Sequence, residues 1–346
     1  MSGLLSYSGL TTKIRAMESH LLKDEDYRKI AELSTVSEVA AYLKRRPGYA
    51  EVLGNLDENH LSRGEIEPYL YASIYWGFMR IYRFAKPEQK LFLDLYFERY
   101  EIFTIKRYFR MMEDKKVYVP KFGKFGAFFR KHTQLDLEKL TASRSMTELI
   151  ENLNGTDYYP ALRPLLERGD FSSFDYEMAL DMDYFRRIWK AKDKILSGES
   201  LESITKAYGV KFDLLNLDWI YRSKKYYRMS EGDIYAMLIP MHYRLKKQEI
   251  VALVEAASMD EFAAILGRTY YANKYEPLEP GTLEEMYVYI LRTTLTQEAR
   301  KHPYSAAIMY SYLYKKEHEI DKVTTAIECI RYHLDAATTY QYITKS

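Results

Sequence analysis

The sequence predicts an all-α protein. Apolar residues recur at three- and four-residue steps over long stretches, which is the period of an amphipathic helix. Turn residues are sparse, because only 15 Gly and 10 Pro occur among 346 residues. Convincing stretches of alternating apolar and polar residues, which are typical of half-buried strands, are absent.

Two long helices are the clearest elements. Ile66, Leu70, Ile74, Phe78 and Ile81 form the apolar stripe of the first helix. The stripe of the second helix consists of Leu91, Leu95, Ile102, Ile105, Phe109 and Met112. Pro87 lies between them and separates the two helices.

Composition favours a folded protein without a dominant charge. Hydrophobic residues make up 47% of the chain, which is enough for a sizeable core and excludes global disorder. Lys and Arg number 51 and Asp and Glu 49, so the net charge is +2 and gives no whole-chain argument for nucleic-acid binding. The 34 Tyr are unusual, and they suit both half-buried helix faces and protein interfaces.

Cys329 is the single cysteine, so no internal disulfide forms. It stands in an apolar helical stretch and is predicted to be a small buried side chain. No run of 18 apolar residues predicts a transmembrane helix, and the first residues do not resemble a signal peptide. A cytoplasmic protein is expected.

A capping-box pattern occurs three times. In each, a hydroxyl residue is followed three positions later by Glu and then by an apolar run, so the hydroxyl and the Glu cap free amides at a helix start. The three boxes are Thr35–Glu38, Ser145–Glu148 and Ser258–Glu261. Their Glu residues are 110 and then 113 positions apart.

Further landmarks repeat with the boxes. A tyrosine follows each box in the next loop, and an acidic residue lies later in a long helix. The tyrosines are Tyr49, Tyr158 and Tyr271, and the acids are Glu101, Asp213 and Glu319. Repetition in one order predicts three similar helical modules, 1–116, 117–228 and 229–346, with a pseudo-threefold arrangement.

Residue patterns for catalysis or metal binding are missing. The seven His show no metal-ligand spacing, and residues 316–319 (KEHE) lack the second His of a zinc-protease helix. A solvated helix surface is the better interpretation of these residues. We expect no cofactor, no metal and no enzymatic activity. An active site assembled from carboxylates of several modules stays an alternative.

Two basic clusters stand out. Residues 106–131 carry nine basic and two acidic residues, a local net charge of +7, and residues 222–228 form a second cluster. Solvated faces, docking on an acidic protein or anionic lipid, and single-stranded nucleic-acid binding all fit such clusters. The candidate docking residues are Arg110, Lys121, Lys124, Arg222, Lys224, Lys225 and Arg228.

The C-terminal region resembles the C subunit of the V-type and archaeal-type rotary ATPases, whose counterpart in the eukaryotic pump is the d subunit. Residues 312–320 (YLYKKEHEI) and 327–334 (IECIRYHL) carry the family pattern, as does YI at 342–343. Residues 213–217 (DLLNL) look like the family's acidic-x-x-Asn-Leu element. Thr104 and Lys322 stand where Asn is expected in the other copies, and His333 replaces a Gly.

This resemblance implies a non-catalytic component whose three helical modules form a funnel-like socket. One end of the socket sits on the cytoplasmic face of the membrane proteolipid ring, and the other receives the central shaft, which is made of the D and F subunits. The chain, which is a monomer within the larger complex and peripherally associated with the membrane, then couples ATP turnover to H+ or Na+ transport. The alternative is a helical nucleic-acid-binding protein that uses clusters 106–131 and 222–228.

Overall fold

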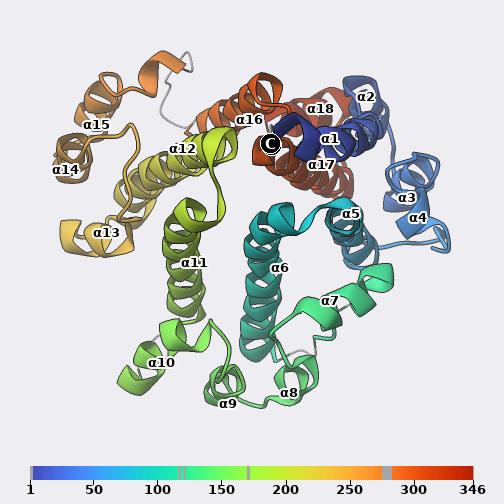
Figure 1. Cartoon of the computed structure of the whole chain (residues 1–346), viewed down its shortest axis with the longest axis horizontal. Helices are drawn as coiled ribbons and strands as arrows, with labels where there is room; N and C mark the ends of the chain where they lie inside the picture. Colours follow the sequence, from blue (N-terminus) through green and yellow to red (C-terminus); the bar gives the residue numbers. More distant parts are fainter. Residues whose placement is uncertain (1–2, 116–117, 121, 170–171, 275–282, 346) are drawn as a thin grey trace. The chain divides into compact units, whose positions relative to one another are not determined.

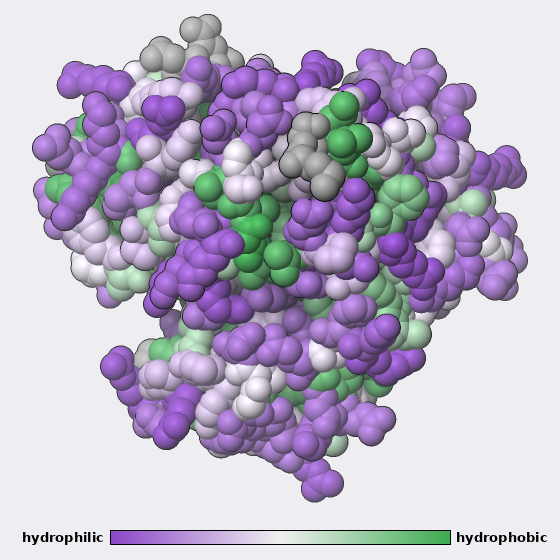
Figure 2. All heavy atoms as spheres, in the orientation of Figure 1, coloured by the Kyte–Doolittle hydropathy of each residue, from purple (hydrophilic) through white to green (hydrophobic). Residues whose placement is uncertain are grey.

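The computed structural model describes residues 3–115, 118–120, 122–169, 172–274 and 283–345. Every regular element in these ranges is a helix, which confirms the all-α class (Figure 1). None of these helices combines the length and the apolar character needed to cross a bilayer. Hydrophilic side chains cover most of the face drawn in Figure 2, and hydrophobic side chains gather in smaller patches.

The chain divides into two compact units. The smaller unit contains Met1–Thr11, Leu196–Lys315 and Lys345–Ser346, and the larger unit contains Thr12–Ile195 and Lys316–Thr344. The division falls inside α1 (Gly3–Glu18) and α17 (Ala306–Arg331), and just before the last residue of α18 (Ala336–Lys345). The three ranges 1–116, 117–228 and 229–346, and their pseudo-threefold arrangement, stay predictions.

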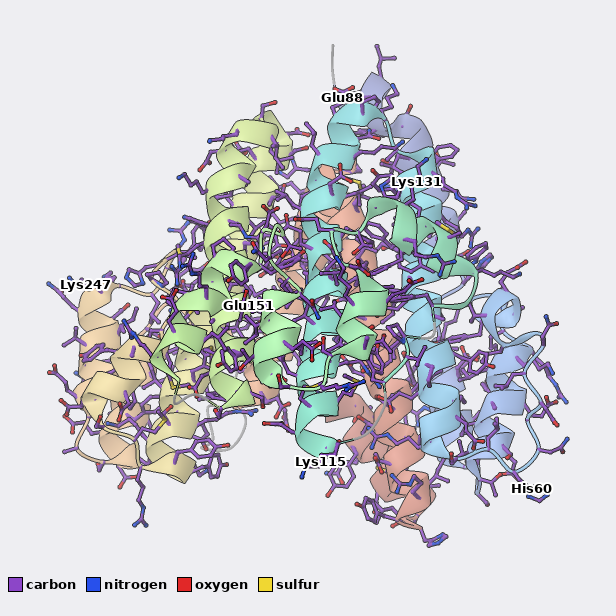
Figure 3. The ribbon with its side chains drawn as sticks, turned by 90° about the horizontal axis from the view of Figure 1, so that it is seen from below. His60, Glu88, Lys115, Lys131, Glu151 and Lys247 are labelled. Carbon is purple, nitrogen blue, oxygen red and sulfur yellow. The ribbon has the colours of Figure 1, made fainter. Side chains whose placement is uncertain are left out.

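The three longest complete helices described in the larger unit are α5 (Arg63–Phe84), α6 (Pro87–Asp114) and α11 (Ser173–Ile195). The unit also includes the second parts of α1 and α17 and nearly all of α18. The other helices of the larger unit, apart from its portions of α1 and α17, are α2 (Asp24–Ala31), α3 (Val36–Lys44), α4 (Ala50–Leu53), η1 (Gly123–Phe125), α7 (Gly126–His132), α8 (Leu137–Ala142), α9 (Met146–Glu151), α10 (Tyr159–Arg168) and α18 (Ala336–Lys345). Helix α6 packs against α11. Figure 3 shows α6 extending from Glu88 at one end to Lys115 at the other.

Helices α5 and α6 confirm both predicted long helices, but the predicted face of α6 needs correction. All five stripe residues of α5 are buried. In α6, Leu91 is 48% exposed and Leu95 is only partly buried, whereas Phe92, Tyr96 and Phe97 face the core. The apolar residues of α6 exceed one helix face, so its bulkier aromatic side chains take the interior.

Aromatic rings fill the space between α5, α6 and α7. Tyr75 stacks on Phe125 at 4.9 Å between ring centroids, and Phe97 contacts Phe129 at 5.3 Å. Each such pair contributes roughly 0.5–1.5 kcal/mol beyond its area burial. Among the residues that the structure describes, seven tyrosines are fully buried: Tyr49, Tyr96, Tyr108, Tyr158, Tyr208, Tyr271 and Tyr310. Part of the tyrosine excess therefore belongs to the core.

The smaller unit contains the long helix α12 (Gly198–Arg222), which packs against α16 (Leu283–Lys301). Its shorter elements are the π-helix η2 (Ser223–Tyr227), α13 (Glu231–Met237), α14 (Lys247–Glu255), α15 (Met259–Leu266) and η3 (Ala272–Lys274). Gly209 lets the loop after α13 approach α12, because a Cβ at this position would lie 2.5 Å from Cγ of Tyr243.

The hydroxyl cap forms in all three predicted boxes, and among them the Thr35–Glu38 box is complete, because Glu38 also accepts from the amide of the cap residue Thr35 at 3.2 Å. The hydroxyls of Thr35, Ser145 and Ser258 accept hydrogen bonds of 3.1, 3.2 and 3.1 Å from the amide three residues later. Each box Glu reaches back to the amide of the residue before the cap, at 2.7, 2.8 and 2.8 Å. These bonds satisfy the free amides that begin α3, α9 and α15.

Candidate functional site

The three acidic landmarks share one kind of buried environment. Glu101 on α6, Asp213 on α12 and Glu319 on α17 are 1%, 0% and 2% exposed. Each carboxylate accepts a hydrogen bond from one of the three loop tyrosines. The pairs are Tyr158–Glu101 at 2.7 Å, Tyr271–Asp213 at 2.6 Å and Tyr49–Glu319 at 2.8 Å. We call these arrangements the acid–tyrosine clusters.

In the Glu101 cluster, the carboxylate binds the segment that joins α7 to α8. It accepts hydrogen bonds from the hydroxyl of Thr133 at 2.6 Å and from the amide of Gln134 at 2.7 Å. Burial raises the pKa of the Glu101 carboxyl, and the hydrogen bonds from Thr133, Tyr158 and Gln134 oppose that rise. The Glu101 cluster therefore joins α6 to the segment before α8 and to the loop after α9.

In the Asp213 cluster, the carboxylate collects more donors. Besides the Tyr271 hydroxyl, the backbone amides of residues 243–245 donate to it at 3.0, 2.6 and 2.9 Å. Asn216 lies one turn later, donates to the Ile239 carbonyl at 3.0 Å and accepts from the Ile239 amide at 2.8 Å. The acidic-x-x-Asn pattern thus holds the loop after α13 against α12.

In the Glu319 cluster, a buried lysine balances the acid. Lys316 Nζ lies 2.6 Å from Glu319 and 3.9 Å from the ring centre of Tyr49, and the Leu22 amide donates to Glu319 at 2.5 Å. The expectation of a solvated surface for residues 316–319 is wrong for Lys316 and Glu319, which are 3% and 2% exposed. Their mutual ion pair makes this burial possible.

The pairing between acids and tyrosines is the part that sequence reasoning missed. Tyr158 and Tyr271 follow their acids by 57 and 58 positions, whereas Tyr49 precedes Glu319 by 270. Each acid thus contacts the loop of the next predicted module, and the last acid contacts the first loop. The sequence did contain a signal for this pairing. The spacings from Glu101 to Tyr158 and from Asp213 to Tyr271 are nearly equal, at 57 and 58 positions, whereas the distances from box Glu to acid vary from 58 to 65.

The clusters are suited to holding loops rather than to transferring protons. A carboxylate that accepts several hydrogen bonds is fixed in place. Removing it leaves buried donors without an acceptor, which lowers the stability of the folded chain. The Glu101 and Glu319 clusters belong to the larger unit, and the Asp213 cluster belongs to the smaller unit. Their shared arrangement links α6, α12 and α17 to loops remote in sequence.

Beside the Glu101 cluster, an ion-pair network joins α6 to α11. Arg187 donates to Glu98 and, at 2.7 Å, to Asp183, and its guanidinium lies 5.5 Å from the ring centre of Tyr158. Burial is the largest influence on Glu98 and raises the pKa of its carboxyl to about 7, although Arg187 opposes the shift. Glu98 is therefore the carboxyl of this network whose charge changes near neutral pH.

The candidate docking residues of the first basic cluster have local acidic partners. Arg110 Nε lies 3.2 Å from Glu177, and Lys124 Nζ lies 2.7 Å from Glu51. Both side chains are mostly exposed, at 63% and 59%, so a docking partner would compete with weak surface pairs. Lys121 lies outside the described residues.

The second basic cluster is only partly available for docking. Arg222 pairs with Asp218 at 2.9 Å, and Lys224 Nζ donates to the Val254 carbonyl at 2.5 Å. Lys225 donates to the Tyr221 hydroxyl at 2.5 Å but is exposed, and Arg228 is exposed with φ of 49°.

Two exposed tyrosines accompany these cations. Tyr226 and Tyr227 are 61% and 72% exposed, and they lie between Lys225 and Arg228 in sequence. Rings with one polar end and exposed cations suit a protein interface. We call Lys225, Tyr226, Tyr227 and Arg228 the basic–aromatic segment of η2.

No group of His, Cys, Asp and Glu in the described ranges is arranged to hold a metal ion. His302 departs from the expected solvated surface: it is 8% exposed, and its Nδ1 lies 3.3 Å from Glu199. Cys329 is 6% exposed on α17, which confirms the predicted buried thiol.

Comparison with known proteins assigns the family. A sequence model described as ATP synthase (C/AC39) subunit matches residues 10–342. The chain belongs to this family. It is 26% identical to the C subunit of the A-type ATP synthase from Methanosarcina mazei over 78% of this chain and 72% of that protein.

Other archaeal proteins of the same description match nearly the whole chain. The A-type ATP synthase C subunit of Methanosarcina acetivorans is 24% identical over 93% of this chain and 88% of its own length. The protein of that description from Thermococcus kodakarensis is 24% identical over 94% and 86%. The family match over residues 10–342 spans the positions of the three acid–tyrosine clusters and confirms the resemblance stated from the sequence.

Proposed function

We propose that the chain is a non-catalytic central-stalk component of a V-type or A-type ATPase. In this function it is a socket between the rotating D–F shaft and the membrane proteolipid ring, and it couples ATP turnover to H+ or Na+ transport. It acts on the cytoplasmic side, held at the membrane through the complex. The observation that carries the proposal is the family match over residues 10–342.

The acid–tyrosine clusters support the mechanical part of this proposal. A component that transmits torque has to keep its helices and loops fixed under load. Each cluster fastens a loop to a long helix through hydrogen bonds to a buried carboxylate, and such charge-assisted bonds are stronger than neutral ones. Three repeated clusters also support three similar modules, in which the first loop is closed by the last long helix.

Association with the ATPase is the direct test. A tagged chain expressed in its native cell, with membranes solubilised in mild detergent, should co-purify with the nucleotide-binding head, the D and F subunits and the proteolipid ring. Identification of these partners by mass spectrometry, in constant ratio across preparations, is the expected result. Reproducible purification without them, from cells that assemble the ATPase, contradicts the proposal.

The basic–aromatic segment of η2 is the proposed docking surface, and it can be changed without breaking an ion pair. Lys225→Glu with Arg228→Glu should weaken assembly, and the difference from the unchanged chain should be largest at low salt and shrink as salt rises, because salt screens the electrostatic part of the attraction. Arg222 and Lys224 are less suitable, since their reversal also removes contacts to Asp218 and Val254.

Arg186→Glu with Lys190→Glu is the matched control, because both residues are exposed on α11 and the change in charge is equal. Unchanged assembly of the Lys225/Arg228 variant across a salt series rejects the docking surface. A nucleic-acid-binding function predicts instead that the isolated chain binds single-stranded RNA or DNA and loses it in the same variant.

A further inference from the structure

A cavity of about 330 Å³ lies beside α5 and α6 in the larger unit. Tyr71 and Tyr75 of α5, Phe103 and Arg107 of α6, and Tyr118 of the following segment line it. Arg107 is about two turns before Lys115, which Figure 3 labels at the end of α6. The volume is within the range of sites for small molecules.

Arg107 differs from its basic neighbours on α6. Lys106 pairs with Asp181 at 2.6 Å and Arg110 pairs with Glu177 at 3.2 Å. Arg107 forms no ion pair with a carboxylate in the part of the chain that the structure describes. Its guanidinium lies instead 5.6 Å from the ring centre of Phe103 and 5.1 Å from that of Tyr118.

Contacts of this kind involve the ring faces and leave N–H groups of the guanidinium for a further partner. A half-buried cation without a counter-charge favours an anion, because the anion replaces water that the cation has lost. The cavity thus offers a charged donor with a fixed fork geometry.

Phenol hydroxyls add neutral donors to the same cavity. Tyr71, Tyr75 and Tyr118 form ring contacts but no hydrogen bond to another described residue. Burial raises the pKa of all three phenols, that of Tyr118 to about 12. Glu67 and Asp321 raise the pKa of Tyr71 further, whereas the charge of Arg107 lowers the pKa of each phenol. Their hydroxyls therefore stay protonated at neutral pH and can donate to an anion.

We propose that this cavity binds a small aromatic carboxylate, with the carboxylate on Arg107 and its ring among the aromatic walls. Arg107 and the tyrosine hydroxyls match the two oxygens of a carboxylate. Phe103 and the tyrosine rings offer flat faces at which a planar ring gains offset or edge contacts. Both features are needed to favour this ligand over a simple inorganic anion. The inference is independent of the ATPase assignment.

Benzoate and benzamide form the matched pair of probes, since they have nearly the same shape and differ in charge. Ligand-observed NMR titration of the full chain should show benzoate binding at least about tenfold more tightly than benzamide, as expected for a charge-assisted hydrogen bond in place of a neutral one. Benzoate should also bind more tightly than cyclohexanecarboxylate, which lacks the flat ring, and than inorganic phosphate.

Arg107→Gln should weaken benzoate binding about tenfold or more, and Arg107→Lys should retain part of it. Arg110→Gln is the control. It also removes one positive charge, but Arg110 lies about one turn after Arg107 and is paired with Glu177. Circular dichroism and thermal unfolding establish that each variant is folded, and if Arg107→Gln is unfolded then Arg107→Lys and the probe series decide. Equal binding of benzoate and benzamide, equal binding of benzoate and phosphate, or equal loss in the Arg107→Gln and Arg110→Gln variants overturns the proposal.

Discussion

Asp213 in the smaller unit and Glu101 in the larger unit hold similar loops with side chains of different length. The Asp side chain is one methylene shorter, so its loop has to approach the helix more closely. Gly209, one turn before Asp213, permits that approach, because any Cβ there would collide with Tyr243. The corresponding position before Glu101 is Phe97, whose ring packs in the aromatic core.

This comparison shows that the acid and the residue one helical turn before it act as a pair. A short acid with a glycine brings three backbone amides onto one carboxylate. A longer acid with a full side chain one turn earlier binds one amide and two hydroxyls. The two clusters should therefore tolerate mutation differently.

The largest expected effect is that of Asp213→Asn. Its amide nitrogen cannot accept a hydrogen bond, so at least one backbone donor of residues 243–245 loses its partner in a buried site. Unfolding free energy should fall by about 3 kcal/mol or more. Glu101→Gln should cost less, about 1–2 kcal/mol, because the hydroxyls of Thr133 and Tyr158 can turn and accept from the new amide.

Native-state hydrogen exchange measures both variants locally. Amides 243–245 should lose protection in Asp213→Asn, and the amide of Gln134 should lose less in Glu101→Gln. Equal loss in the two variants contradicts the difference between the clusters.

An effect smaller than that of Asp213→Asn is expected for Gly209→Ala, which adds only a methyl group. The methyl group would lie 2.5 Å from Tyr243 Cγ, so the loop has to shift at a cost of about 1–3 kcal/mol. Gly64→Ala is the control, because a Cβ there meets no atom within 4 Å and alanine is the better helix former. Thermal unfolding should show a lower midpoint for Gly209→Ala and an unchanged or higher one for Gly64→Ala. A midpoint that Gly209→Ala leaves unchanged contradicts the close approach.

Local signals in the sequence predicted local structure well. The hydroxyl caps of the three boxes, α5 and most of α6 depend on residues within a few positions of each other, and these features formed as expected. The face of α6 was partly wrong, since Leu91 and Leu95 compete with larger aromatic side chains for the interior.

Contacts between distant residues were harder to predict. Glu101, Asp213 and Glu319 were recognised as a repeated set, but their hydrogen bonds reach 57, 58 and 270 positions along the chain. The roles of Gly209 and Lys316 depend on close contacts, with Tyr243 and with Tyr49, that a single sequence does not reveal. The role of Arg107 likewise depends on which carboxylates the fold brings near it.

The smallest expected effect is a dependence of stability on pH through Glu98. Its pKa of about 7 in the folded chain is above the value of roughly 4.3 for an unperturbed Glu, so between these values the folded state binds more protons than the unfolded state. This residue therefore makes the chain less stable as pH rises from about 4.5 to 7. Glu98→Gln should reduce that slope in urea unfolding measured across the range.

Glu177→Gln, which removes the partner of Arg110 at the surface, serves as the control for this series and should leave the slope in place. A slope that is the same with and without Glu98 contradicts its raised pKa. If both variants lose the dependence of stability on pH, that dependence comes from the net charge of the larger unit and not from Glu98 alone.

The central claim is that the chain couples the ATPase head to the membrane ring without taking part in catalysis. The direct measurement is ATP hydrolysis and ion transport in membrane vesicles from cells that lack the chain, with and without dicyclohexylcarbodiimide, which blocks the ring carboxylates. We predict that the head still hydrolyses ATP, that this activity no longer responds to the reagent, that ion transport is lost, and that the added chain restores both. Loss of ATP hydrolysis in the vesicles that lack the chain, or ion transport that persists in them, would contradict the account.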